Sequence, residues 1–112
     1  MAEISSDVIR GYNDTMILSL LKEGDSYGYE VSKRIKKMTE EKYIIKETTL
    51  YSAFTRMEKN GYISSFSKMA ENGRQRTYYR ITKAGRAYYK EKCDEWQVTK
   101  EVVDCFVPKE IA

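Results

Sequence analysis

The sequence predicts a single domain that is mainly α-helical and carries one small β-hairpin. Apolar residues recur at helical spacing through three segments of the first 60 residues and again towards the end of the chain. After Gly61 the period changes to two on either side of an Asn-Gly pair, which is the strongest short-range signal of a hairpin. The length of 112 residues suits one domain with a modest core.

Three helices are expected before the hairpin, over residues 5–23, 26–38 and 48–60. Each has apolar side chains on one inward face, with Met38 on that face of the second helix and Leu50, Phe54 and Met57 on that of the third. Gly11 interrupts the first helix, so a hinge is expected there. The residues expected to cap the three N-termini are Ser5 or Ser6, Asp25 or Ser26, and Thr48 or its neighbour.

The hairpin is expected to follow the third helix directly. Gly61 provides the left-handed residue that ends the helix. Strands are expected over residues 62–68 and 74–82, and the loop between them contains Asn72-Gly73. Two helices followed at once by a hairpin are typical of a winged helix-turn-helix, in which the hairpin is the wing.

A long helix is expected to complete the chain. Thr82 is the expected N-cap, and Pro108 stops the helix shortly after Phe106. We therefore predict that residues 1–82 form the winged helix-turn-helix and that residues 83–112 form a C-terminal dimerisation helix. The two parts are expected to pack as one compact unit.

The composition excludes most kinds of enzyme. The chain contains no histidine, and it lacks a Gly-rich phosphate loop, a Cys-x-x-Cys pair and a nucleophile elbow. We expect no catalysis, no cofactor and no metal site. The longest apolar run, residues 16–21, is too short to cross a membrane, and no signal peptide opens the chain, so a cytoplasmic protein without a membrane partner is expected.

The net charge of +3 is distributed unevenly along the chain. Residues 93–112 hold five acidic side chains against two lysines, a balance of −3, so residues 1–92 carry +6. Basic residues cluster in the second helix around Lys33 and again in the hairpin. A single basic cluster is usually only a solvated surface and is weak evidence for a polyanionic partner. A basic third helix followed directly by a basic hairpin is harder to explain as coincidence.

The outward face of the third helix suits the major groove of double-stranded DNA. Its small hydroxyl side chains let the backbone approach, while longer polar side chains reach phosphates or base edges. The arginines beside the Asn-Gly turn suit contact with a phosphate backbone or a minor groove. Arg80 lies deeper towards the body, so a structural role is the alternative for this residue. The alternative to DNA binding is that the third helix is an ordinary amphipathic helix with a polar side facing solvent. The residues expected to contact DNA are Lys33, Thr48, Thr49, Tyr51, Ser52, Thr55, Arg56, Lys59, Arg74 and Arg76.

The last helix carries an apolar seam with alternating spacings of four and three residues, interrupted by Lys100. Such a seam predicts pairing with a second copy, and the alternative is a monomer whose last helix folds back on the first. Trp96, in the middle of the seam, is either a packing residue or one half of a pair that sandwiches a planar aromatic ligand. The expected dimer-interface residues are Tyr89, Cys93, Trp96, Val103, Phe106 and Val107.

Several segments resemble the PadR family of bacterial transcriptional regulators. The stretch "TLYSAFTRMEKNGYISS" and the later "GRQRTYYRITKAG" are similar to the family's helix start, turn and wing, and "YGYEVSKRI" matches in the second helix. The resemblance covers about residues 10–90, and Ser52 stands where the family has a proline. It implies a dimeric winged-helix repressor that releases DNA when a small molecule binds.

Because the chain has a single helix after the wing, it looks like the short-tailed, multidrug-sensing branch of that family. In that branch, tryptophans from two subunits stack planar, often cationic drugs in a channel between them. By position, Trp96 would be the stacking residue. Lys100 departs from the pattern and would favour neutral or anionic ligands. The ligand-binding residues that the resemblance implies are Val8, Cys93, Trp96, Thr99, Lys100 and Val103.

The sequence therefore predicts a homodimeric, ligand-responsive transcriptional repressor. Two other classes stay open. One is a winged-helix module that binds a protein instead of DNA, and the other is a small-molecule carrier with incidental DNA affinity.

Overall fold

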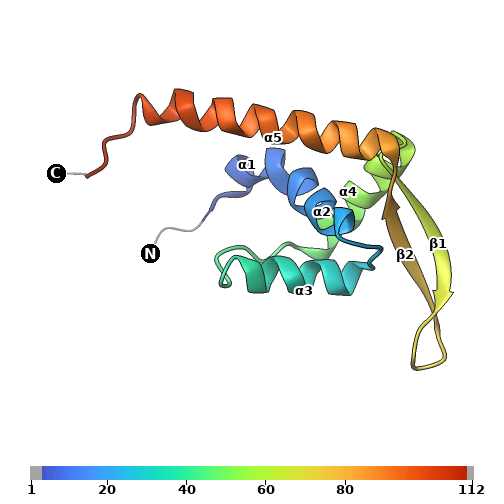
Figure 1. Cartoon of the computed structure of the whole chain (residues 1–112). Coiled ribbons are helices and arrows are strands. Elements are labelled where there is room, and N and C mark those ends of the chain that lie inside the picture. Colours follow the sequence, from blue (N-terminus) through green and yellow to red (C-terminus); the bar gives the residue numbers. More distant parts are fainter. Residues whose placement is uncertain (1–3, 111–112) are drawn as a thin grey trace.

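The computed structural model describes residues 4–110; residues 1–3 of the first expected unit and residues 111–112 of the second lie outside the described residues. The helices and the hairpin follow one another in the expected order (Figure 1). The elements are α1 (Ser6–Ile9), the 3-10 helix η1 (Arg10–Tyr12), α2 (Asn13–Lys22), α3 (Gly28–Met38), α4 (Glu47–Lys59), β1 (Ile63–Met69), β2 (Gln75–Ile81) and α5 (Lys83–Asp104). The mainly helical fold with one hairpin and a long C-terminal helix is confirmed.

The core lies where the apolar faces of α2, α3 and α4 meet, with α5 across one side and the hairpin at one end (Figure 1). Leu18 of α2, Val31 of α3 and Met57 of α4 are fully buried. Phe54 of α4 stacks on Tyr79 of β2, with ring centroids 3.9 Å apart. Burying a side chain of this size contributes about 1.5–3 kcal/mol, so packing, more than intrinsic helix propensity, holds these short helices.

The first predicted helix is broken where the glycine interrupts it. The short helix α1 begins after Ser5, whose hydroxyl accepts a hydrogen bond from the Val8 amide at 3.3 Å, as expected for an N-cap. The helix η1 then contains Gly11, and α2 begins at Asn13. The break gives α1 a direction different from that of α2 (Figure 1).

The expected N-cap of the second helix, Asp25 or Ser26, is wrong, because the N-cap is Tyr27. The helix α3 begins at Gly28, and no side chain caps it. Ser26 is instead buried and forms a β-bridge with Tyr79, through backbone hydrogen bonds of 2.7 and 3.2 Å. Met38, expected to face inward, is 65% exposed because it lies in the last turn of α3, beyond the reach of the core.

The helix α4 begins at Glu47, and its N-cap is Lys46 with no side-chain hydrogen bond, so the expectation of a cap at Thr48 or its neighbour is wrong. At the other end the prediction of a left-handed glycine is confirmed. Gly61 has φ +80°, and the Tyr62 amide donates to the Met57 carbonyl at 2.9 Å. This closing turn sends the chain directly from the helix into the hairpin.

The two strands pair antiparallel, from Ile63 opposite Ile81 to Met69 opposite Gln75. Residues 70–74 form the connecting loop, in which Gly73 has φ +82°. Arg74 therefore lies in the loop and not on the second strand as expected. The isolated bridge at Ser26 attaches the base of the hairpin to the turn before α3.

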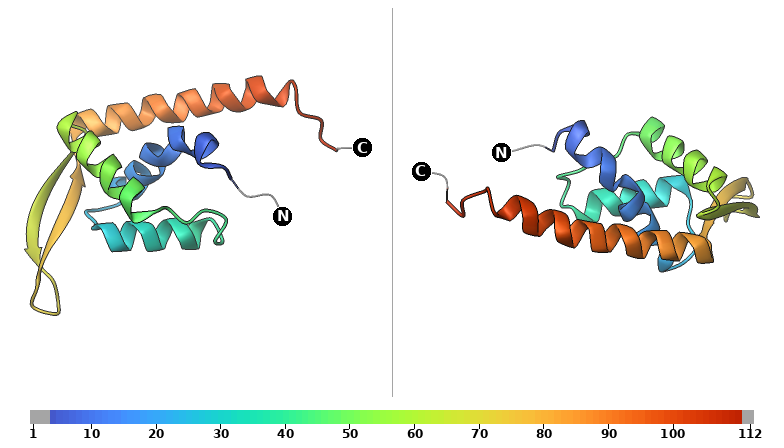
Figure 2. Two further views of the ribbon diagram at one scale, coloured as in Figure 1. Left: turned by 180° about the vertical axis from the view of Figure 1, so that it is seen from behind. Right: turned by 90° about the horizontal axis from the view of Figure 1, so that it is seen from above.

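The last helix begins as expected and then leaves the body of the molecule. The hydroxyl of Thr82 caps it by accepting a hydrogen bond from the Gly85 amide at 3.0 Å. Tyr88 stacks on Tyr62 with ring centroids 4.1 Å apart, which fixes the first turns against the end of α4. The C-terminal half runs past α1 and projects beyond the core in both views of Figure 2. None of the helices within residues 4–110 is long and apolar enough to cross a membrane.

Candidate nucleic-acid interface and C-terminal groove

The outward face of α4 gathers most of the residues predicted to contact DNA. Leu50, Ala53 and Phe54 occupy the inward face, so helical geometry turns the hydroxyl and basic side chains to solvent. Thr49 is half-buried at the edge of this face and lines an adjoining hollow with Asn13. A shallow hollow along the helix is lined by Thr48, Tyr51, Ser52, Thr55, Arg56 and Lys59.

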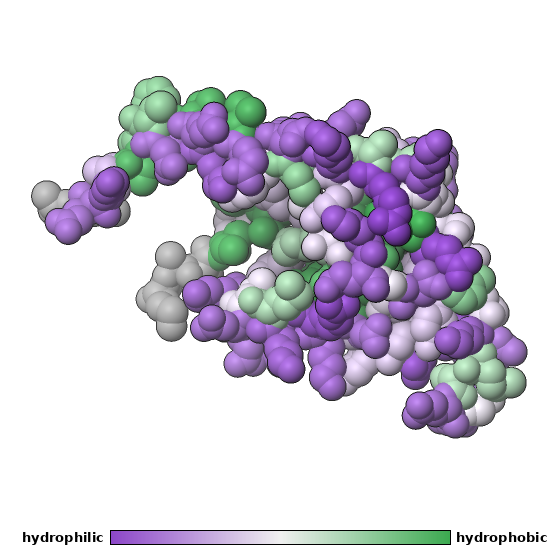
Figure 3. Space-filling view, in the orientation of Figure 1, coloured by the Kyte–Doolittle hydropathy of each residue, from purple (hydrophilic) through white to green (hydrophobic). Residues whose placement is uncertain are grey.

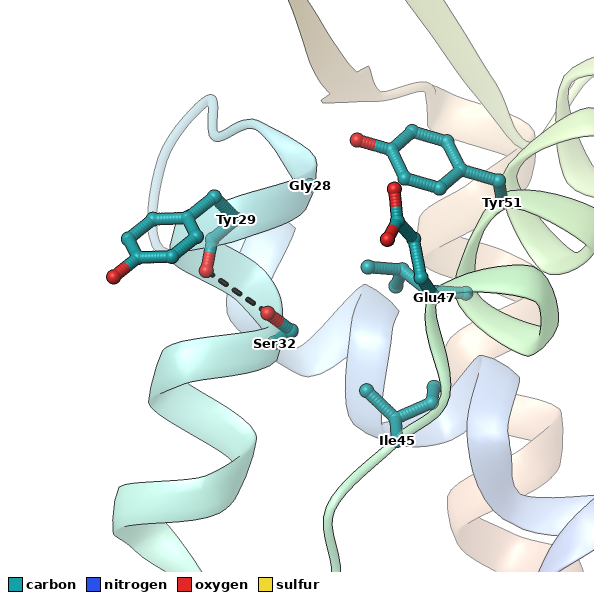
Figure 4. A pocket seen from close by; sticks show the side chains of 7 residues that line it. Gly28, Tyr29, Ser32, Ile45, Glu47 and Tyr51 are labelled. Atoms are coloured by element: carbon teal, nitrogen blue, oxygen red, sulfur yellow. Dashed lines mark hydrogen bonds between the residues drawn. The ribbon is translucent and has the colours of Figure 1, made fainter.

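Tyr51 crosses from α4 towards the first turn of α3 (Figure 4). Its ring meets Phe54 edge to face, with centroids 5.7 Å apart. A Cβ atom on Gly28 would collide with the Tyr51 hydroxyl, so this close approach requires the glycine. A small pocket of about 180 Å³ lies between the two helices, with Tyr29 and Ser32 on the α3 side. Sequence reasoning identified Tyr51 but missed Gly28, for which the only signal was a glycine opening a helix.

Arg56 is the predicted DNA-contacting residue whose surroundings differ most from the expectation. Its guanidinium donates two hydrogen bonds to the Asp14 carboxylate on α2, at 2.6 and 2.7 Å. These hydrogen bonds raise the pKa of Arg56 above its usual value, although partial burial acts against them. The side chain of Asp14 is 9% exposed, and its second hydrogen-bond donor is the Tyr88 hydroxyl at 2.9 Å. Asp14 gave no signal in the sequence beyond an acid beside an apolar stripe.

The basic residues outside α4 are spread over two elements. Lys33 is exposed on α3, outside the hollow along α4. Arg74 is exposed in the hairpin loop. Arg76, on β2, is half-buried, and its guanidinium lies 4.0 Å from the centroid of the Tyr27 ring. Arg76 is therefore held against the base of the wing, whereas Arg74 projects at its tip.

The structural alternative for Arg80 is confirmed. Its guanidinium donates to the Asp25 carboxylate at 2.7, 3.1 and 3.2 Å and lies over the Phe66 ring. The hydrogen bond from Arg80 lowers the pKa of Asp25 below its usual value, and the charge of Lys68 acts in the same direction. This ion pair joins the hairpin to the turn between α2 and α3.

A second hollow lies between α5 and the N-terminal segment. It has a volume of about 580 Å³. Its lining residues, together the C-terminal groove, are Ile4, Val8, Ile9, Tyr12, Thr15, Met16, Trp96, Thr99, Lys100, Val103 and Asp104. Five of the six predicted ligand-binding residues thus come together, while Cys93 is half-buried outside the lining. Sequence reasoning missed Tyr12, whose ring meets Trp96 edge to face with centroids 5.0 Å apart.

The distal half of α5 leaves a row of large apolar side chains exposed. Phe106 is 83% exposed, and Val103 and Val107 are about half exposed. Figure 3 shows hydrophobic residues gathered at this end of α5 and over the N-terminal segment beside it. Tyr89 differs from these predicted interface residues, because it is half-buried against the core and the Lys22 ammonium lies 5.3 Å from its ring centroid. In the described part of the chain, no group of three or more His, Cys, Asp or Glu side chains is arranged to hold a metal ion.

Known proteins are similar to this chain in both sequence and architecture. A solved transcriptional regulator from Clostridium thermocellum is 65% identical, and the match covers 92% of this chain and 100% of that one with a TM-score of 0.87. A PadR family transcription regulator from Clostridium difficile is 34% identical over 87% of this chain and 99% of its own, with a TM-score of 0.75. An uncharacterized protein from Lysinibacillus sphaericus is 44% identical over 104 residues, 93% of this chain and 95% of its own length.

The family model that matches the chain covers the same part of the fold. It spans residues 17–91, which include the helix-turn-helix, the hairpin and the first turns of α5. The chain therefore belongs to the PadR-like family of transcriptional regulators.

Proposed function

We propose that the protein is a homodimeric repressor that binds operator DNA through α4 and the hairpin and responds to a planar aromatic molecule at the dimer seam. The observation that carries the DNA-binding part is the outward face of α4, where hydroxyl and basic side chains line one continuous hollow. An α-helix with such a face fits the major groove of B-DNA. The family, whose members are transcriptional regulators, supports the same conclusion.

The wing supplies a second contact with the same duplex. Arg74 at the hairpin tip is free to reach a phosphate, and Arg76 extends along β2 towards the body. Phosphate contacts fix the register of a protein on DNA, while contacts to base edges carry the sequence preference. In this division, Ser52 and Thr55 approach the bases, and Lys59 and Arg74 hold the backbone.

The exposed apolar end of α5 supports the homodimer. Phe106 is largely exposed and Val107 is about half exposed within the described chain, and a second copy offers the same surface in return. Two recognition helices related by a two-fold axis would read half-sites about 34 Å apart. A molecule wedged at the seam would alter that spacing and so weaken binding to DNA.

The C-terminal groove supports a planar ligand and suggests its charge. Trp96 is 40% exposed in the groove, and its ring and that of Tyr12 meet edge to face. The Lys100 ammonium lies 5.9 Å from the Trp96 ring centroid, where it takes the position that a cationic ligand would occupy. We therefore favour neutral or anionic planar aromatic ligands, although Asp104 adds one negative charge to the rim.

The test is binding to a labelled duplex of the region upstream of the protein's own gene, over a series of salt concentrations. We expect tighter binding than to a scrambled duplex, and log K should fall with log salt by about 0.9 for each phosphate contact. Lys59→Gln and Arg74→Gln should each lower this slope by roughly 0.9. Lys90→Gln, on the exposed side of α5, is the matched control and should leave it unchanged.

The same complex then tests the ligand response. Naphthalene-2-sulfonate is a suitable probe because it is planar, aromatic and anionic, and its negative charge keeps it from binding DNA itself. We expect it to quench Trp96 and to weaken binding of the duplex about tenfold, a coupling of about 1.4 kcal/mol. Quenching without any change in DNA affinity would favour a small-molecule carrier over a ligand-responsive repressor.

A further inference from the structure

We infer that Arg56 and Tyr88 are positioning residues for DNA binding: through Asp14 they tie the recognition helix α4 to α5, so that the C-terminal groove and α4 move together. This inference rests on the proposed DNA-binding function and names the route by which the seam would influence it.

The geometry around Asp14 joins three helices at one carboxylate. Asp14, in the first turn of α2, is buried. From α4, the Arg56 Nη1 and Nη2 atoms donate to its Oδ2 and Oδ1 atoms at 2.7 and 2.6 Å. From α5, the Tyr88 hydroxyl donates to the Oδ2 atom at 2.9 Å. Bidentate pairs of this kind fix orientation as well as distance, so the carboxylate sets where α4 and α5 lie relative to α2.

The residues just before Asp14 in the chain face the C-terminal groove. Tyr12, two residues before Asp14, lies against Trp96, which the groove exposes. A displacement of Trp96 or of α5 would therefore move the start of α2, which carries Asp14. Because a buried carboxylate that loses its partners is strongly disfavoured, Arg56 and the helix that bears it follow that displacement.

Arg56 is also poorly placed to act as a phosphate contact. Both terminal nitrogens of its guanidinium donate to Asp14, so the end-on fork is occupied and the positive charge is already paired. Its half-exposed side chain lines the hollow along α4, next to the residues that would meet DNA. Arg56 thus acts on DNA through the position of α4.

Tyr88 offers a clean way to cut the link. Its ring stacks on Tyr62, which lies just after the turn that ends α4, and its hydroxyl donates to Asp14. Tyr88→Phe keeps the ring stack and the Arg56–Asp14 pair while removing the bond from α5. The matched control is Tyr43→Phe. The Tyr43 hydroxyl donates at 2.6 Å to Asn13, the neighbour of Asp14, but Tyr43 lies in a loop outside α4 and α5.

The experiment follows Trp96 fluorescence as the full-length protein is saturated with a duplex that the wild-type protein has selected from a random-sequence pool. Trp96 is the single tryptophan, so its emission reports on the groove alone. Coupling between two sites is reciprocal, so DNA should change the groove if the groove changes DNA binding. We expect the duplex to shift Trp96 emission in the wild-type protein and in Tyr43→Phe, and at least half of that shift to be lost in Tyr88→Phe.

A second arm tests Arg56 without relying on fluorescence. Arg56→Gln should weaken binding of the selected duplex by tenfold or more and leave the slope of log K against log salt unchanged, because no phosphate contact is lost. In Lys59→Gln, the comparison on the same helix, the slope should fall by roughly 0.9. A comparable fall in Arg56→Gln would make Arg56 a phosphate contact and overturn its positioning role.

The outcomes separate this inference from the proposed function. If the wild-type protein binds the duplex but Trp96 emission does not change, or if Tyr88→Phe keeps the full shift, the link through Asp14 is overturned and DNA binding stands. If no duplex is selected at all, the proposed DNA-binding function fails and the inference fails with it.

Discussion

At the scale of single residues, two glycines allow close contacts that differ in kind. A Cβ atom on Gly85 would clash with the backbone carbonyl of Tyr62 and lie 2.9 Å from a side-chain carbon of Ile81. A Cβ atom on Gly28 would meet only the far end of the Tyr51 side chain. A backbone carbonyl cannot move aside, whereas a tyrosine ring can rotate away. The first glycine therefore serves stability, and the second serves the placement of Tyr51.

This difference gives a prediction for alanine substitutions. Gly85→Ala should destabilise the fold by about 1–3 kcal/mol or more, because it overpacks the junction of α5 with the end of α4. Gly28→Ala should change the free energy of unfolding by less than about 1 kcal/mol, yet weaken DNA binding by displacing Tyr51. Urea unfolding and duplex binding measure the two effects. Gly11→Ala, where a Cβ atom meets nothing within 4 Å, is the control; equal destabilisation by all three variants would contradict the argument.

At the scale of elements, the hairpin is attached to the helical body by a few defined contacts. Asp25 binds Arg80 of β2, and the neighbouring Ser26 pairs through its backbone with Tyr79. The Arg76 guanidinium stacks on Tyr27 in the same turn. These contacts hold the base of the wing, whereas the loop at its tip, residues 70–74, is closed by hydrogen bonds within itself.

The Asp25–Arg80 pair makes the attachment of the hairpin sensitive to acid. Because Arg80 lowers the pKa of Asp25 in the folded protein below its usual value of 3.8, the pair stabilises the fold above about pH 4. That contribution is lost as the pH falls through the lowered pKa. Asp25→Asn should therefore destabilise the protein at pH 6 and have almost no effect near pH 2, as measured by urea unfolding. Asp94→Asn, which removes an exposed pair within α5, should have little effect at pH 6; a pH-independent effect of Asp25→Asn would contradict the prediction.

At the scale of the whole molecule, the single chain is more extended than its length requires. Its radius of gyration is 15.9 Å and its extents are 57 × 30 × 21 Å. A compact domain of this size has a radius of about 13 Å. The excess comes from the distal half of α5, which projects past the core and exposes Phe106 and Val107 (Figures 1 and 2). A helix with an apolar face is stable when that face is covered, which favours a second copy.

At the scale of the whole molecule, we predict how a charge on this apolar face of α5 would affect its pairing with a second copy. Val103→Glu places a charge on the exposed apolar face of α5 at the groove. This variant should raise the dissociation constant of the proposed dimer by roughly a hundredfold, because burying an unpaired charge costs several kcal/mol. Gln97→Glu adds the same charge at an exposed polar site of α5 and is the control. Sedimentation equilibrium measures both, and a wild-type protein that stays monomeric at all concentrations would contradict the homodimer.

Much of the fold could be predicted from the sequence because its signals are local. The Thr82 cap, the left-handed Gly61 and the Asn-Gly hairpin each depend on a few neighbouring residues, and all three are found. The failures lie at the ends of helices and at the start of β2, where Arg74 was expected on the strand but lies in the loop. Ser26 was expected to cap α3 but pairs with Tyr79, because a distant strand competes for its backbone.

The candidate sites divide in the same way. Helical periodicity was enough to place Ser52, Thr55 and Lys59 on one face of α4. The heptad spacing was enough to place Trp96 and Val103 on one face of α5. What periodicity cannot supply is the partner of a side chain. Cys93 shares the seam's spacing but lies outside the groove, because the lining on the other side comes from α1, η1 and α2.

The sequence by itself thus determined the order of the elements, the faces they bury and the family to which the chain belongs, since periods, caps and turns act within a few residues. Only the tertiary structure decided that Arg56 is bound to Asp14, 42 residues away, and Arg80 to Asp25, 55 residues away. The physical reason is that an ion pair forms between whichever charges the packed helices, strands and turns bring together, and that packing depends on every element at once.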